Sequence, residues 1–92
     1  MGNLYFYKKF DMGQKFDAKG YLSKIGKQVR KLRKEKTQLG YIDFAKKVKL
    51  NKKTYYKIER GEGDYNISNL IKIISYYSPD ISLTKFFYDA GL

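Results

Sequence analysis

The fold is decided by residues 41–61, which read YIDFAKKVKLNKKTYYKIERG. In the first half of this stretch, Tyr41, Phe44, Ala45 and Val48 are three or four positions from one another, with Phe44 and Ala45 adjacent. Apolar residues with this spacing share one face of a helix. We therefore expect a short helix over about 41–48.

The second half predicts another short helix, over about 52–60. Asn51 stands directly before it as a favourable N-cap, and Gly61 follows it as a favourable C′ residue. Tyr55 and Ile58 are expected to point inward, while the lysines of this helix point outward. Because only three residues separate the two helices, the pair has the geometry of a helix-turn-helix unit, in which the second helix presents its exposed side chains to a partner.

Three further helices are expected around this pair, over about 21–36, 67–77 and 83–89. Each has apolar residues at helical spacing: Leu22, Ile25, Val29 and Leu32 in the first, Ile67, Leu70, Ile71 and Ile74 in the second, and Leu83, Phe86 and Phe87 in the third. Asn66 and Ser82 are suitable N-caps for the last two. Pro79 separates them, because proline cannot continue a helix.

Residues 1–19 lack this helical period. Leu4, Phe6 and Phe10 alternate with more polar neighbours, which favours a short strand or an extended aromatic arm. The fold class predicted for the whole chain is therefore all-α, with an N-terminal arm at 1–19 and one five-helix domain at 20–92.

The positive charge is concentrated in the helix-turn-helix unit and the helix before it. The chain has a net charge of +11, and residues 24–60, with 14 basic and 3 acidic side chains, carry all of it. A segment with that much self-repulsion is typical of proteins that bind a polyanion such as DNA. The alternative is a solvated lysine-rich surface, because only 3 of the 20 basic residues are arginine.

Several classes of protein are disfavoured by composition. The chain has 92 residues without Cys or His, which removes disulfides, thiolate nucleophiles and the commonest metal ligands and general bases. Its nine acidic residues form no cluster with the spacing of metal ligands. We expect no enzyme activity, no metal and no cofactor. No apolar run has the length of a membrane helix, so we expect a cytoplasmic protein without a membrane partner.

Five segments, spread over about residues 24–88, carry a resemblance to a known family, and the last two of them, 67–74 and 81–87, match its two C-terminal helices. Residues 25–36 (IGKQVRKLRKEK) resemble the first helix of the lambda-repressor/Cro-like helix-turn-helix regulators, the xenobiotic-response-element type. Residues 44–48 (FAKKV) are similar to its second helix, and residues 50–61 (LNKKTYYKIERG) are similar to its turn and recognition helix. The resemblance implies a five-helix lambda-repressor-like domain that binds double-stranded DNA and regulates transcription, with the helix at 52–60 in the major groove.

The resemblance also implies roles for individual residues. The residues implied to contact DNA are Tyr41, Asn51, Lys52, Lys53, Thr54, Tyr56 and Lys57. Of these, Lys53 suits guanine O6 and N7, and Thr54 suits a base edge or a thymine methyl group. Arg33 and Glu59 fall where the family often has an ion pair that orients the recognition helix; a phosphate contact is the alternative for Arg33.

The chain also departs from the family pattern. Tyr41 stands where the family commonly has a phosphate-binding Gln, so its ring either fills the core or its hydroxyl contacts a phosphate. Ile42 stands at a position that is normally polar. Lysines on the recognition face weaken the expectation of sharp base readout and leave non-specific nucleic-acid binding as an alternative.

The family implies a homodimer, for which the sequence offers two surfaces. One is the last helix, with Phe86, Phe87, Tyr88 and Leu92, and the other is the arm. The same aromatic residues could instead fill the core of a monomer. A further alternative is a protein-interaction module of the same fold, such as an antitoxin-like or phage accessory protein, whose protein partner docks on the arm.

Overall fold

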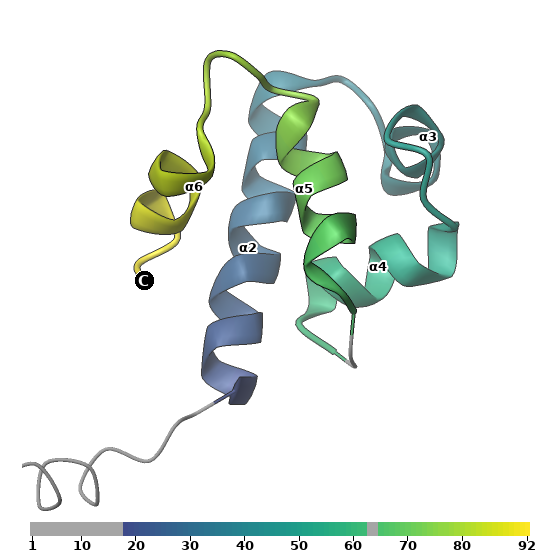
Figure 1. The fold of residues 1–92 in the computed structure, drawn as a ribbon. Helices are drawn as coiled ribbons and strands as arrows, with labels where there is room; N and C mark the ends of the chain where they lie inside the picture. Colours follow the sequence, from purple (N-terminus) through teal and green to yellow (C-terminus); the bar gives the residue numbers. More distant parts are fainter. Residues whose placement is uncertain (1–17, 63–64) are drawn as a thin grey trace, which may run out of the picture.

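A computed structural model describes residues 18–62 and 65–92 of the chain. This part contains five helices and no strand, which confirms the all-α fold class (Figure 1). The helices are α2 (Ala18–Lys36), α3 (Tyr41–Lys47), α4 (Lys52–Arg60), α5 (Ile67–Ser75) and α6 (Leu83–Asp89). The aromatic arm was predicted over residues 1–19. Residues 1–17 lie outside the described residues, and Ala18 and Lys19 belong to α2, so the predicted boundary of the arm is two residues too late.

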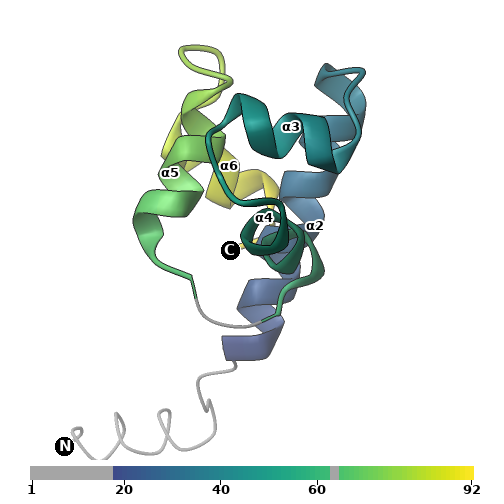
Figure 2. The ribbon, with the colours of Figure 1, turned by 90° about the vertical axis from the view of Figure 1, so that its right-hand side faces the viewer.

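Helix α2 is the longest element and runs the length of the domain. It begins three residues earlier than predicted and buries Val29 and Leu32 in the core. In Figure 1, α3 and α4 lie on one side of α2 and α6 lies on the other; Figure 2 looks onto α3 and α4 and places α6 behind them. The DNA-binding pair of helices predicted from the sequence is therefore separated from the C-terminal helix by α2.

A hydroxyl group stabilises the turn between α2 and α3. The Thr37 Oγ1 hydroxyl donates to the Arg33 carbonyl oxygen at 2.7 Å and accepts the Leu39 N–H at 3.1 Å. Thr37 is buried, so these bonds satisfy a polar group that would otherwise be costly to bury. Gly40 then stands at the N-cap of α3, where no side chain caps the helix.

The boundaries of α4 agree with those predicted. The Asn51 side-chain oxygen accepts the Lys53 N–H at 2.8 Å, which satisfies one of the free donors at the start of the helix. Gly61 ends α4 in the left-handed conformation, with φ of 69°, where a side chain would be strained. Helix α3 ends at Lys47, one residue before the predicted boundary.

The core is a single cluster to which all five helices or their connections contribute. Its fully or nearly fully buried apolar residues are Val29, Leu32, Phe44, Ala45, Val48, Tyr55, Ile58, Leu70, Ile73, Ile74, Tyr77, Ile81 and Phe86. The side chains of Asn66 and Ser82 accept the N–H groups of Asn69 and Lys85, so the two predicted caps of α5 and α6 are confirmed.

The surface proposed on α6 is smaller than the sequence suggested. Phe86 is fully buried, and Phe87 is partly buried against the core, so Phe86 is not available to a partner and Phe87 is available only in part. Tyr88 and Leu92 are exposed. The sequence pattern cannot make this distinction, because two adjacent apolar residues on a short helix face different directions and only the neighbouring helices decide which is covered.

Candidate nucleic-acid interface

Helix α4 crosses α2 at very short range. An ideal Cβ atom built on Gly26 would lie 2.4 Å from the Ile58 carbonyl oxygen and 2.5 Å from that of Glu59. Both atoms belong to the backbone, so they cannot move aside as a flexible side chain could. Gly26 therefore sets how closely α4 approaches α2, a role that no feature of the sequence indicates.

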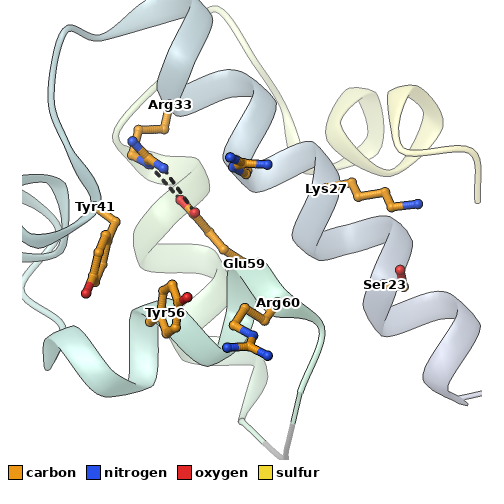
Figure 3. A pocket seen from close by; sticks show the side chains of 8 residues that line it. Ser23, Lys27, Arg33, Tyr41, Tyr56, Glu59 and Arg60 are labelled. Carbon is orange, nitrogen blue, oxygen red and sulfur yellow. Dashed lines mark hydrogen bonds and ion pairs between the residues drawn. The ribbon is translucent and has the colours of Figure 1, made fainter.

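A nearly buried ion pair holds the two helices in this arrangement. Arg33 donates from Nε and Nη2 to the two carboxylate oxygens of Glu59, at 2.7 and 3.1 Å (Figure 3). Its Nη1 donates to the Leu39 carbonyl oxygen at 3.0 Å. The side chains of Arg33 and Glu59 are only 9% and 5% exposed. A two-bond arginine–carboxylate pair of this kind fixes orientation as well as adding energy.

Tyr55 joins the pair from within α4. Its hydroxyl donates to the Glu59 carboxylate, and its ring packs edge-on against Phe44 at 5.5 Å between centroids. Burial, followed by the bond to Glu59, raises the pKa of Tyr55 far above its usual range. The bond to Glu59 likewise raises the pKa of Arg33. The network therefore contains a neutral Tyr55 hydroxyl and a charged Arg33 guanidinium at any ordinary pH.

The predicted contact residues of α4 lie at its start and along its exposed side. Lys52 and Lys53 are exposed in the first turn, Lys57 is exposed one turn later, and Thr54 is half-buried. Lys53 and Lys57 are four residues apart and so share one face of the helix. Two exposed cations at the start of an exposed helix suit an anionic partner, because they add to the positive end of the helix dipole.

Asn51 and Tyr41 take positions beside this face. Asn51 is exposed and uses its side-chain oxygen as the cap, which leaves its NH₂ group free to donate to a partner. Tyr41 is half-buried against the core, and its ring lies 4.8 Å from that of Tyr56, centroid to centroid, at a tilt of 32°. The structure therefore brings Tyr41 and Tyr56 together at the junction of α3 and α4.

The pocket shown in Figure 3 continues from these two tyrosines between α2 and α4. Its volume is about 550 Å³, and residues of α2 complete its lining. Lys27, Arg30 and Arg60 contribute to it and were not among the predicted contact residues. Helical spacing groups Lys27 with Arg30 on α2, but no local signal could have joined them to Arg60, because α2 and α4 meet only through tertiary packing.

Comparison with known proteins identifies the family. Residues 27–78, more than half of the chain, match the helix-turn-helix family. The chain is a helix-turn-helix protein of the Cro and C1 repressor type. It is 36% identical over 66 residues to the control protein C.MunI of a Mycoplasma species, which covers 72% of this chain and 86% of that protein. No solved structure gave a significant match.

This membership confirms the expected lambda-repressor-like fold and the expected class of function. The helix-turn-helix protein described here is a DNA-binding transcriptional regulator, from a family of regulators rather than of enzymes. Within residues 18–62 and 65–92, no three acidic residues are grouped so that they could hold a metal ion. No helix in the same ranges is long and apolar enough to cross a membrane.

Proposed function

We propose that this regulator recognises a specific double-stranded DNA sequence by placing α4 in the major groove. The observation that carries the proposal is the set of exposed lysines on α4, a helix held in place by the buried ion pair and the close contact at Gly26. Lys52, Lys53 and Lys57 then face base edges and phosphates, and the half-buried Thr54 meets a base edge or a thymine methyl group. The free NH₂ of Asn51 and the hydroxyl of Tyr41 bind phosphates.

The test is enrichment of binding sites from a random duplex pool at about physiological salt. We expect a defined sequence to be enriched, and Lys53→Ala to relax preference at one position in each half-site. Lys31→Ala is the matched control, because Lys31 is an exposed lysine of α2 that lines a pocket beside α6. Retention of DNA without enrichment would replace sequence-specific recognition with charge-driven binding, and absence of retention would contradict the proposal.

We further propose that the regulator binds as a homodimer through α5 and the start of α6. Ile67, Ile71 and Leu83 are 57%, 44% and 40% exposed, although they are large apolar residues. Residues 65–92 carry no net charge, whereas residues 24–60 carry +11. Two copies can therefore meet at this face without the repulsion that two α2–α4 faces would create. Two bound half-sites would then be about 34 Å apart, which makes the enriched sequence two-fold symmetric.

Sedimentation measurements can test this face directly. We expect Ile71→Lys to convert a dimer into a monomer, because a charge at the centre of an apolar interface stays unpaired. Ile42→Lys is the matched control, since Ile42 is 41% exposed but lies on α3. A dimer that survives Ile71→Lys and is lost with Ile42→Lys would assign the interface to α3 instead.

We also propose that a protein partner docks on the N-terminal arm, on the basis of the aromatic residues that the sequence places there. Removal of residues 1–17 tests it without shortening α2, which begins at Ala18. An arm that only docks a protein leaves DNA affinity unchanged when it is removed. Loss of DNA affinity would show that the arm contributes to the DNA complex itself.

A further inference from the structure

The chain has only three arginines, and all three line the pocket between α2 and α4. They are Arg30 and Arg33 on α2 and Arg60 at the end of α4. The other 17 basic residues are lysines, spread over the chain. Arginine differs from lysine in presenting several N–H donors in a planar fork that matches phosphate and carboxylate geometry. Three arginines in one pocket therefore offer planar sets of hydrogen-bond donors as well as positive charge.

The pocket is built from two facing helix stripes. On α2, Ser23, Lys27 and Arg30 are spaced by four and three residues, so they share one face. On α4, Tyr56 and Arg60 are four residues apart, and the Arg60 guanidinium carbon lies 5.4 Å from the centre of the Tyr56 ring. Figure 3 shows Tyr56 between Tyr41 and Arg60 along this second wall. The Tyr56 ring thus supports Arg60 at the mouth of the recess.

The cationic side chains that line the pocket outnumber the acidic side chains available to pair with them. Glu59 is its one acidic lining residue, and the carboxylate of Glu59 is already bound by Arg33 and Tyr55. Lys27 and Arg30 have no ion pair with any residue in 18–62 or 65–92. Arg60 pairs at 2.8 Å with Glu62, but both side chains are about half exposed, and exposed pairs are weak. Three cations are therefore available to an added anion.

We propose that this pocket is a second anion site, separate from the first turn of α4, which takes a phosphate group between Arg30, Arg60 and Lys27. The two guanidinium groups bind phosphate oxygens with paired hydrogen bonds, and Lys27 adds a third cation. The volume of about 550 Å³ falls within the range of small-ligand sites, so the recess has room for a phosphate with a neighbouring group attached.

Two sources can supply this phosphate. One is the backbone of the DNA strand beside α4, in which case the site extends the proposed DNA contact and rests on that function. The other is a free phosphorylated molecule, which needs no DNA. Because Tyr41 and Tyr56 line the pocket and are also predicted to lie at the DNA interface, a free ligand would compete with DNA for the same region.

The test uses the full chain and two double variants. Arg30→Ala with Arg60→Ala removes two cations from the pocket. Lys31→Ala with Lys36→Ala removes two cations elsewhere, because both lysines line a different pocket, beside α6. The first arm titrates inorganic pyrophosphate, followed by amide chemical shifts. We expect binding to the unchanged protein and to the lysine variant, and affinity at least about tenfold lower for the arginine variant, the effect of losing about 1.4 kcal/mol.

The second arm measures binding to a random-sequence duplex as a function of salt. Loss of this one phosphate contact lowers the slope of log K against log salt by about 0.9, the contribution of one neutralised phosphate. A slope change confined to the arginine variant, without pyrophosphate binding, assigns the phosphate to DNA. Pyrophosphate binding that depends on the arginines supports a free ligand even if the duplex is not bound at all. If the arginine variant behaves like the lysine variant in both arms, the proposal is wrong.

Discussion

The two halves of the domain differ in charge and in the kind of side chain that they leave exposed. Residues 24–60 carry all of the net charge and a nearly buried network of Arg33, Tyr55 and Glu59. Residues 65–92 are electrically neutral, and their exposed side chains include Ile67, Ile71 and Leu83. The first half is shaped to meet a polyanion and needs polar bonds to hold its helices at a fixed angle. The second half supplies apolar surface to the core and leaves apolar surface uncovered.

The largest effect should come from removing one member of the buried pair. We expect Glu59→Ala to lower the free energy of unfolding by about 3–5 kcal/mol, because Arg33 then stays buried without its carboxylate. Urea denaturation measures this loss. Replacing both residues, with Arg33→Met and Glu59→Leu, should restore most of the stability, since no unpaired charge remains. A loss below about 1 kcal/mol for Glu59→Ala would mean that the pair is not desolvated.

The close approach of α2 and α4 is tested by adding one methyl group. Gly26→Ala places a carbon against two backbone oxygens, so we expect a loss of about 2–3 kcal/mol in urea denaturation. Gly40→Ala is the matched control, because a Cβ atom there meets nothing within 4 Å. Similar small losses for both variants would contradict the role assigned to Gly26.

The two halves each bury a tyrosine, and the hydroxyl groups of these tyrosines differ in their hydrogen bonding. The Tyr55 hydroxyl donates to Glu59, whereas the buried Tyr77 hydroxyl has no hydrogen-bond partner among the described residues. Tyr55→Phe should therefore cost about 1.5–3 kcal/mol, the range for a hydrogen bond to a charged group. Tyr77→Phe should leave the thermal midpoint unchanged or raise it, since it removes an unsatisfied polar atom. The reverse order of midpoints would overturn this comparison.

The ionisation of these two tyrosines should make the free energy of unfolding depend on pH in the alkaline range. Burial raises the pKa of both Tyr55 and Tyr77 above the ordinary value of 10.0. Above pH 10 the unfolded chain releases these protons while the folded chain keeps them, so the free energy of unfolding falls as pH rises. Each tyrosine contributes a slope of about 1.4 kcal/mol per pH unit in this range. Denaturation between pH 9 and 11 should show a shallower fall for Tyr77→Phe than for the unchanged protein; equal slopes would contradict the assignment.

The smallest expected effects come from substituting the two asparagine caps, one of which is also proposed to contact DNA. Asn51 caps α4 and Asn66 caps α5, each through its side-chain oxygen. We expect Asn51→Ala and Asn66→Ala to cost a similar amount, about 1 kcal/mol. Only Asn51→Ala should also weaken DNA binding, because only its NH₂ group lies at the proposed interface. Equal DNA affinities for the two variants would limit Asn51 to capping.

Local chemistry explains why most of the secondary structure was predictable. The caps at Asn51, Asn66 and Ser82 and the stop at Gly61 depend on residues within a few positions, which the sequence displays directly. The early start of α2 at Ala18 was missed, because the apolar period that defines this helix begins only at Leu22. The Arg33–Glu59 pair came from family resemblance and not from spacing, since the two residues are 26 positions apart.

The sequence by itself determined the helices, the charge of one half and the family of the chain, because periodicity, capping and composition are properties of neighbouring residues. Only the tertiary structure decided that Gly26 touches the backbone of α4, that Phe86 is buried while Tyr88 is exposed, and that the three arginines share one pocket. These outcomes depend on how α2 packs against α4 and α6. That packing is set by the combined shape of side chains from distant segments, and no single stretch of the chain contains it.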